Sequence, residues 1–346
     1  MYSVHISDIR TFLKCRRAWN FSSPLRLNLE PTLPYAPFYI GRAIHHCIEL
    51  WKAQGAPMRQ SLSDYIQNER NQMDEVDFID IEKNVELILG ILEHYALVWE
   101  EEIGPFSDTN LEFIEMEKEF SVPLPEAGKD VFLEGRFDGI VQRKDDKTFW
   151  IWETKTTRSI SEFSRSLFND NQCTVYTWAA RRLGDYPVKG VLYNLIKKST
   201  PTQPHLVSGG LLQKTKTLNA SYWSYLRAIK DEHPAFTEEY INRFYGEYLE
   251  YLSKSKNDWF MRQPVVKSQD EIDIVMSEIV DIAREMINPN TPLYANPSWL
   301  SCTYCQFRNP CTAVNRGKKI ADILGVEYRR KVVAQSMRTT EEIADA

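Results

Sequence analysis

The alternation of apolar and polar residues predicts a β-hairpin near the middle of the chain. Segment 131–157, VFLEGRFDGIVQRKDDKTFWIWETKTT, contains two stretches rich in β-branched and aromatic residues, joined by the polar turn 144–147. Residues 111–123 alternate in the same way and predict a strand that precedes the hairpin. Residues 190–197 predict a fourth strand, and the helical pattern before it implies a right-handed crossover.

Apolar residues at helical spacing predict helices on either side of this hairpin. The predicted helices cover residues 7–21, 40–54, 64–70, 81–102, 159–183, about 220–253 and about 269–287. Residues 199–219, which include prolines and glycines, predict a long polar loop. Residues 259–266 predict a short strand between the last two helices. Helical segments therefore precede and follow the strands in the chain.

The hairpin carries a candidate group of catalytic side chains. Successive side chains on a strand point to opposite faces, so Glu153 and Lys155 share one face and Thr154 lies on the other. The hairpin register can bring Asp138 beside this pair. Two neighbouring carboxylates repel each other unless a cation lies between them, and hard oxygen ligands suit Mg²⁺ or Mn²⁺.

Such an ion clamps the attacking and leaving oxygens of a phosphodiester, which predicts phosphodiesterase chemistry. Lys155 could orient a nucleophilic water or neutralise charge on the scissile phosphate. The alternative is an exposed hairpin with a cross-strand salt bridge, which is the commoner meaning of an isolated Asp…Glu-x-Lys pattern. The remaining motifs of the chain decide between the two interpretations.

Composition and charge narrow the class of protein. With 346 residues and 43% hydrophobic content, the chain can bury a substantial core in one large or two modest domains. It contains no apolar run long enough to span a membrane and no signal-peptide pattern, so we expect a cytoplasmic protein with no membrane partner. The net charge of −6 argues against nucleic-acid binding driven by overall charge, although a local basic surface can still bind DNA.

Four of the six cysteines form a candidate metal set: Cys15, Cys302, Cys305 and Cys311. The last three have the spacing C-x₂-C-x₅-C, and three thiolates in a tight loop can face one metal centre. Cys15, whose basic neighbours favour the thiolate, is the candidate fourth ligand. On spacing alone an iron–sulfur cluster, a zinc site and a redox dithiol all remain open. Cys47 and Cys173 are predicted to be ordinary buried cysteines.

Five motifs occur in a characteristic order. They are Gly41-x₃-His45, Gly135-Arg-Phe-Asp138-Gly, Glu153-Thr-Lys155-Thr, Gln172-x₃-Tyr176 and Cys15…Cys302-x₂-Cys305-x₅-Cys311. In this order and spacing the chain resembles the RecB-like branch of the PD-(D/E)XK nuclease superfamily over residues 15–311. It is most similar to the iron–sulfur members, which include the AddB nuclease domain and the CRISPR-associated and phage recombination exonucleases. One departure is Thr157, where many relatives have glycine.

This resemblance implies an α/β (α+β) fold with a restriction-endonuclease-like core, in which helices flank a mixed central β-sheet. It implies one nuclease domain over residues 1–346, whose N- and C-terminal segments are joined by an iron–sulfur cluster. The implied parts are a helical insertion at 55–110, a catalytic sheet core at 111–198, a second helical insertion at 199–290, a cysteine loop at 296–312 joined to Cys15, and a basic helical tail at 313–346.

The resemblance also implies roles for individual residues. The metal ligands would be His45, Asp138, Glu153 and the main-chain carbonyl of Thr154. A histidine taken alone is more often a core or surface residue than a ligand, so the role of His45 depends on the whole set of motifs. Lys155 would be the catalytic lysine, and Gln172 and Tyr176 would position DNA or support that lysine. Cys15, Cys302, Cys305 and Cys311 would hold a four-iron, four-sulfur cluster, with zinc as the alternative.

The implied function is a Mg²⁺- or Mn²⁺-dependent exonuclease that degrades DNA with a free end in recombination, repair or phage DNA processing. The chain has no G-x₄-G-K-[S/T] phosphate loop, so a partner such as a helicase, a single-strand annealing protein or an integrase would supply related activities. Two alternatives remain: a CRISPR spacer-processing nuclease, and a non-catalytic iron–sulfur subunit for DNA binding or assembly. The retained acids and lysine argue against the second alternative.

Overall fold

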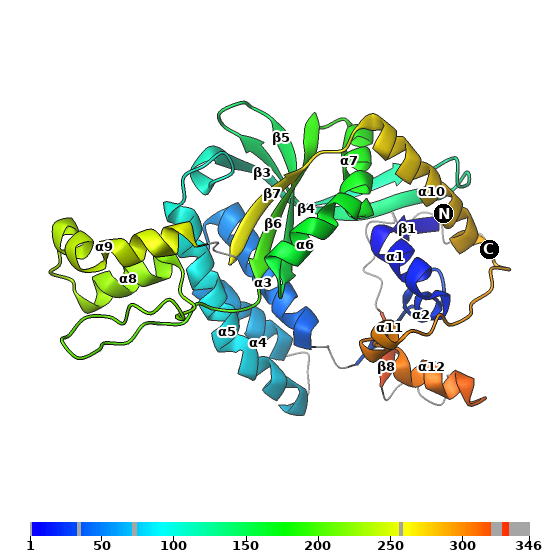
Figure 1. The fold of residues 1–346 in the computed structure, drawn as a ribbon. Coiled ribbons are helices and arrows are strands. Elements are labelled where there is room, and N and C mark those ends of the chain that lie inside the picture. Colours follow the sequence, from blue (N-terminus) through cyan, green and yellow to red (C-terminus); the bar gives the residue numbers. More distant parts are fainter. Residues whose placement is uncertain (1, 33–35, 71–74, 256–258, 320–326, 332–346) are drawn as a thin grey trace. The chain divides into compact units, whose positions relative to one another are not determined.

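The computed structural model describes residues 2–32, 36–70, 75–255, 259–319 and 327–331 (Figure 1). The chain divides into two compact units, which we call unit 1 and unit 2. Unit 1 comprises Met1–Tyr35, Pro123–Phe132 and Ile279–Ala346, and unit 2 comprises Ala36–Val122 and Leu133–Glu278. The four candidate cysteines belong to unit 1, whereas the candidate acids, histidine and lysine belong to unit 2. The single nuclease domain stays a prediction.

A mixed β-sheet in unit 2 carries most of the candidate site. Its strands that lie wholly or mainly in unit 2 are β3 (Leu111–Pro123), β4 (Val131–Arg143), β5 (Phe149–Thr157), β6 (Val188–Lys197) and β7 (Phe260–Val265). Strands β4 and β5 form the predicted antiparallel hairpin, with Gly139 opposite Trp152. Strand β6 runs parallel to β5, β7 runs antiparallel to β6, and β3 pairs with β4. The mixed sheet confirms the predicted α/β fold class.

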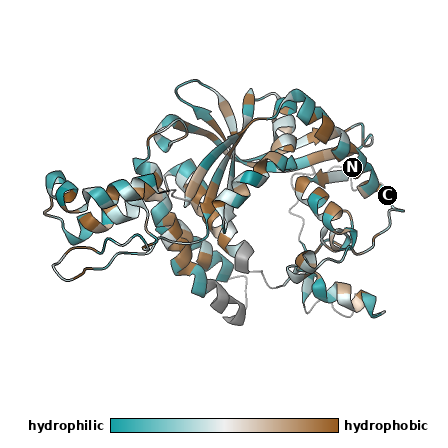
Figure 2. Cartoon of the chain, in the orientation of Figure 1, coloured by the Kyte–Doolittle hydropathy of each residue, from teal (hydrophilic) through white to brown (hydrophobic). Residues whose placement is uncertain are grey.

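Helices pack on both faces of this sheet. They are α3 (Ala36–Gln54), α4 (Met58–Arg70), α5 (Glu75–Glu101), η1 (Asp108–Asn110), α6 (Ile160–Ser166), η2 (Leu167–Asn169) and α7 (Asn171–Leu183). Helices α3 and α5 share an apolar cluster with Ile196 of β6, whereas α7 contacts the opposite face through Glu153 of β5. Strand β6 is buried along most of its length because helices cover it on both sides, and its residues are mainly apolar (Figure 2).

The predicted helix at 159–183 is divided, and the division positions a candidate site residue. Asp170 has an extended backbone and separates η2 from α7. Its side chain accepts a hydrogen bond from the Gln172 backbone N–H at 2.9 Å, which caps the new helix. Gly184 ends α7 in the left-handed conformation with a φ of 77°. Gln172 therefore lies in the first turn of α7, next to the sheet.

The described part of unit 1 contains short elements around an aromatic cluster. The elements are β1 (Tyr2–His5), α1 (Ile6–Lys14), α2 (Arg16–Ser22), β2 (Leu29–Pro31), α11 (Trp299–Thr303), α12 (Arg308–Asn315) and β8 (Tyr328–Arg330). The predicted helix at 7–21 is interrupted at Cys15, which is extended with a φ of −164°. Strands β2 and β8 pair because Tyr328 packs with Phe21 and Phe307, so this part of the predicted helical tail is a strand. Residues 320–326 and 332–346 of that tail lie outside the described residues.

Residues 222–254 of the second predicted helical insertion form a helical hairpin, whereas β7 in the same insertion belongs to the central sheet. Helices α8 (Tyr222–Glu232) and α9 (Glu238–Lys254) pack through a separate cluster centred on Tyr225 and Tyr245, and α10 (Gln269–Ile287) follows β7. Among the described residues, no helix has both the length and the apolar character needed to cross a membrane.

Candidate active site

Strand β5 presents a carboxylate and an ammonium group on one face. Glu153 is 2% exposed, and the Lys155 ammonium contacts its Oε1 atom. The neighbouring Thr154 side chain points to the opposite face, where it contacts Asn194. Alternation along the strand thus has the geometry that the sequence predicts. The face that carries Glu153 and Lys155 is the starting point of the site.

Asp138 of β4 and His45 of α3 lie next to this part of β5. The Thr154 backbone N–H donates a hydrogen bond to Asp138 Oδ2 at 2.7 Å. The same carboxylate oxygen lies 3.4 Å from Nδ1 of His45. The hairpin register therefore brings Asp138 to the strand that carries Glu153, as the sequence predicts, and α3 adds the histidine.

The approach of α3 to β5 depends on Gly41. A Cβ atom added at Gly41 would lie 3.1 Å from the Thr156 hydroxyl oxygen. His45 follows one helical turn later, so it lies on the same face of α3 as Gly41. This close contact gives a physical reason for the glycine in the Gly41-x₃-His45 motif.

Gln172 and Tyr176 both face the protein interior from α7. The Gln172 amide donates a hydrogen bond to Glu153 Oε1 at 2.7 Å, and this glutamine is only 4% exposed. The Tyr176 hydroxyl donates to the Arg136 carbonyl oxygen at 3.0 Å, two residues before Asp138. These contacts orient the Glu153 side chain and the β4 backbone, respectively. The predicted contact of either residue with DNA stays a prediction.

Burial shifts the proton affinities of all three candidate side-chain metal ligands. Burial, together with the nearby Asp138 carboxylate, raises the pKa of Glu153 to about 7, although the Lys155 ammonium opposes this shift. Burial raises the pKa of Asp138 to about 6, although the Lys155 ammonium opposes this shift. Burial lowers the pKa of His45 to about 4, so the imidazole is neutral at neutral pH. A neutral imidazole beside two carboxylates is chemically suited to bind a divalent cation.

One carboxylate oxygen is available for such a cation. Glu153 Oε2 is buried and has no hydrogen-bond partner among the described residues, which is costly for a carboxylate. In this structure the Lys155 ammonium provides the positive charge at Oε1. Among the described residues, no three or more His, Cys, Asp or Glu side chains already have the arrangement of a metal site. The donor chemistry fits Mg²⁺ or Mn²⁺, and the full ligand set stays a prediction.

Glu117 of β3 lies near Glu153, although no sequence motif indicates a role for it. Its carboxylate lies 2.5 Å from the Arg136 guanidinium. Burial raises its pKa, and Glu49 and Glu153 are close enough to contribute to that shift. Glu117 also has a φ of 53°, which is uncommon for a residue other than glycine. No local pattern in the sequence indicates this backbone conformation.

The four candidate cysteines approach one another in unit 1. Burial raises the pKa of Cys305, and the nearby Cys15, Cys302 and Cys311 thiols raise it further. None of them forms a disulfide. The Asn296 backbone N–H donates to Cys15 Sγ at 3.4 Å, so the break between α1 and α2 directs Cys15 towards the cysteine loop. The cluster itself stays a prediction.

The other two cysteines lie outside these groups. Cys47 and Cys173 are fully buried, as predicted.

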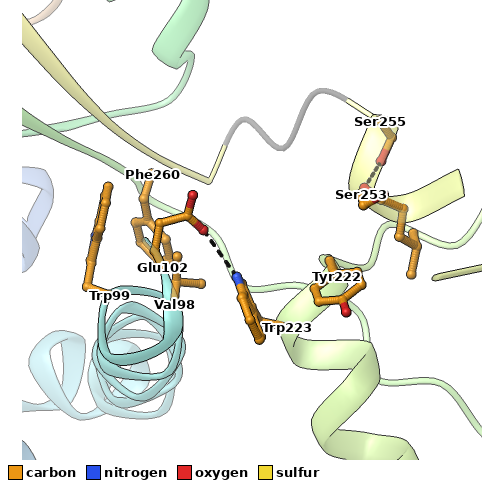
Figure 3. Close-up of a pocket in the computed structure, with 9 residues that line it drawn as sticks. Val98, Trp99, Glu102, Tyr222, Trp223, Ser253, Ser255 and Phe260 are labelled. Carbon is orange, nitrogen blue, oxygen red and sulfur yellow. Dashed lines mark hydrogen bonds between the residues drawn. The ribbon is translucent and has the colours of Figure 1, made fainter. Parts of the chain in front are cut away.

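A pocket of about 440 Å³ lies between α5, α8, α9 and the start of β7 (Figure 3). Trp223 at its edge donates a hydrogen bond to Glu102 at 3.4 Å. The pocket is lined by Val98, Trp99, Glu102, Tyr222, Trp223, Leu252, Ser253, Ser255 and Phe260. None of these is a predicted site residue, and we assign no chemistry to the pocket.

Comparison with known proteins assigns most of the chain to one family. A family model described as the PD-(D/E)XK nuclease superfamily matches residues 4–312, which is most of the chain. The matched range includes the central sheet of unit 2 and the cysteine loop of unit 1. No curated protein matches the chain significantly.

Proposed function

Because the chain belongs to the PD-(D/E)XK nuclease superfamily, whose members are metal-dependent nucleases, we propose that it is an exonuclease that hydrolyses DNA from a free end. One observation carries the catalytic part of this proposal. Glu153 has a buried carboxylate oxygen without a hydrogen-bond partner among the described residues. The nearby Asp138 carboxylate raises the pKa of Glu153, whereas the Lys155 ammonium lowers it. This combination favours a site that binds a divalent cation and a phosphodiester.

The proposed metal ligands are Asp138, Glu153, His45 and the main-chain carbonyl of Thr154. When bound there, Mg²⁺ or Mn²⁺ would supply Lewis-acid stabilisation to the phosphodiester and lower the pKa of water. Lys155 holds Glu153 in the present structure and would orient a nucleophilic water or neutralise charge on the phosphate during the reaction. Gln172 fixes the rotamer of Glu153 through its hydrogen bond.

A basic group at the ends of β5 and β6 supports DNA as the substrate. The Lys198 backbone N–H donates to the Thr157 carbonyl oxygen at 2.8 Å, which joins the two strand ends. Burial lowers the pKa of the Lys198 ammonium, and the nearby Arg158 guanidinium lowers it further. We propose that Arg158 and Lys198 bind DNA phosphates beside the catalytic strand, because a local pair of cations can act in an acidic protein.

We further propose that Cys15, Cys302, Cys305 and Cys311 bind a four-iron, four-sulfur cluster, with zinc as the alternative. The effect of the other three thiols on the pKa of Cys305 supports a common site. We place the activity in recombination, repair or phage DNA processing, with a helicase, an annealing protein or an integrase as partner. A CRISPR spacer-processing nuclease would use the same catalytic residues.

The proposed activity is tested by comparing the cleavage of end-labelled linear DNA with the cleavage of a closed circle of the same sequence. Anaerobically purified protein with Mn²⁺ should degrade linear DNA and leave the circle intact. The Lys155→Ala variant should be inactive, whereas Lys230→Ala, which removes an exposed lysine on α8, should retain activity. Degradation of linear DNA by Lys155→Ala would refute the catalytic assignment. Binding without cleavage by the wild-type protein would favour the non-catalytic subunit.

A further inference from the structure

A polar pair lies directly behind the catalytic strand. Thr154 of β5 and Asn194 of β6 are opposite each other in the parallel register. The Asn194 side-chain amide donates a hydrogen bond to Thr154 Oγ1 at 3.3 Å. Asn194 is fully buried, and Thr154 is 2% exposed. This pair occupies the sheet face opposite the Glu153 and Lys155 side chains.

The hydrogen bonds continue from Asn194 into the core. The Tyr95 hydroxyl of α5 donates to Asn194 Oδ1 at 3.1 Å and accepts from the Arg262 guanidinium at 3.3 Å. Arg262 of β7 also lies 2.6 Å from Asp108, whose carboxylate contacts the Lys52 ammonium of α3. A continuous hydrogen-bonded series therefore runs from a largely buried ion cluster to Thr154.

The Thr154 peptide connects this series with the candidate site. Its N–H donates to Asp138 Oδ2 at 2.7 Å, and the Thr154 backbone is close enough to His45 to oppose the fall in the pKa of that imidazole. The N–H and the carbonyl of Thr154 belong to successive peptide groups, so a change in the backbone dihedral angles of Thr154 would displace the groups that face both side chains. The Thr154 hydroxyl, held by Asn194 from the other face, restricts such a rotation.

The polar series is not the least costly way to fill this part of the core. A buried amide or hydroxyl group loses its hydration and recovers only part of that free energy through hydrogen bonds. Leu192 and Trp152 fill neighbouring positions of the same sheet face with apolar side chains. Leucine has the same number of side-chain heavy atoms as asparagine and would avoid the polar cost at position 194. Core packing alone therefore does not explain Asn194.

We propose that Asn194, held by Tyr95, is a positioning residue that fixes the Thr154 peptide and thereby aligns Asp138 and His45 for the divalent cation. This inference rests on the proposed function. Residues that orient metal ligands in this way typically change metal affinity or activity by about 10- to 100-fold when they are replaced. A purely structural role would change stability and leave the affinity of the folded protein for the metal unchanged.

The test measures Mn²⁺ binding by isothermal titration calorimetry, without DNA, in four proteins: wild type, Asn194→Leu, Tyr95→Phe and Tyr225→Phe. Tyr225→Phe is the matched control, because Tyr225 is fully buried and donates one hydrogen bond, at 2.9 Å, to the Gln213 carbonyl oxygen in a separate cluster. We expect the dissociation constant for Mn²⁺ to rise about 10- to 100-fold in Asn194→Leu and less in Tyr95→Phe. The dissociation constant of Tyr225→Phe for Mn²⁺ should remain within about twofold of the wild-type value, well below a 10- to 100-fold rise.

Thermal unfolding of the same variants separates affinity from stability. A folded Asn194→Leu protein that binds Mn²⁺ as tightly as wild type would overturn the inference. If Asn194→Leu does not fold, Tyr95→Phe decides, because it removes only the hydroxyl oxygen that holds Asn194. Unchanged Mn²⁺ affinity in that variant would also overturn the inference. A wild-type protein that binds no Mn²⁺ would overturn the proposed metal site itself, and with it the role of Asn194.

Discussion

Gly41 of α3 faces Thr156 of β5 so closely that a Cβ atom at position 41 would lie 3.1 Å from the Thr156 hydroxyl oxygen. This separation allows the helix that carries His45 to lie against the strand that carries Glu153. This contact predicts that a larger side chain at position 41 lowers nuclease activity more than it lowers the stability of the protein. Alanine favours a helix by about 1 kcal/mol relative to glycine, so the added contact and the helix propensity act in opposite directions.

We therefore expect Gly41→Ala to lower nuclease activity by about tenfold while the melting temperature changes little, because small displacements of positioned groups are costly in catalysis. Thr156→Ala removes the oxygen atom that the new methyl group approaches. The double variant should recover most of the activity, as measured by release of end label. If the double variant is no more active than Gly41→Ala, the steric explanation is wrong.

A buried histidine makes the stability of unit 2 sensitive to acid. His94 of α5 is 5% exposed, its Nε2 lies 2.7 Å from the Ser221 hydroxyl oxygen, and burial lowers its pKa to about 4. The unfolded chain therefore binds a proton at this residue more readily, so stability decreases as the pH falls from about 6.5 towards 4. Between about pH 7 and pH 5 this residue should reduce the free energy of unfolding by about 2 kcal/mol.

Urea unfolding of wild type and His94→Gln at the two pH values measures this contribution. The variant should lose about 2 kcal/mol less than wild type on acidification. Ser221→Ala is the matched control, because it removes the partner of His94 and the cap of α8 but no titratable group. Its stability should be lower than that of wild type at both pH values, with a similar dependence on pH. Equal acid sensitivity in wild type and His94→Gln would contradict the prediction.

Cys305→Ser should remove the proposed cluster. Wild-type protein purified without oxygen should be brown, with a broad absorbance near ~400 nm and about four iron atoms per chain. Cys305→Ser should lose this absorbance and become less stable, since metal binding contributes to folding. Cys173→Ala, which changes a buried cysteine of unit 2, should keep the colour. A colourless wild type with one zinc ion per chain would support the zinc alternative.

The basic group at the strand ends predicts a change in the salt dependence of DNA binding. In the cleavage-deficient Lys155→Ala background, replacement of both Arg158 and Lys198 by alanine should weaken the binding of linear DNA. The slope of log affinity against log salt should become shallower by about 2, because about one counterion is released for each phosphate contact. Fluorescence polarisation between about 50 and 200 mM salt measures the slope. Lys230→Ala should keep the original slope, and an unchanged slope in the double variant would exclude both residues from phosphate contact.

Sequence periodicity predicts the parts of the site that depend on neighbouring residues of one strand or hairpin. The face shared by Glu153 and Lys155 follows from strand alternation, and the proximity of Asp138 follows from the hairpin register. The breaks at Cys15 and Asp170 were not predicted, because apolar spacing continues through both positions. In each case the break depends on the local backbone conformation rather than on the apolar pattern.

Contacts between distant segments are harder to predict. Tyr95 and Arg262 become neighbours only through the packing of α5 against β7, so no local pattern reports them. Asn194 is different, because it is the one amide side chain in the mainly apolar segment GVLYNLIK. A polar side chain in a buried strand needs a partner, and that rule could have identified Asn194 from the sequence.

The composition of unit 1 from separate parts of the chain has a consequence for biosynthesis. Its segments are Met1–Tyr35, Pro123–Phe132 and Ile279–Ala346, whereas unit 2 ends at Glu278. A nascent chain therefore contains all of unit 2 while the cysteine loop is still inside the ribosome. Because domains tend to fold as they emerge, we expect the nuclease sheet to form before the cysteine loop has left the ribosome and can meet Cys15. Assembly of the proposed cluster would then act on a chain whose catalytic strands are already folded.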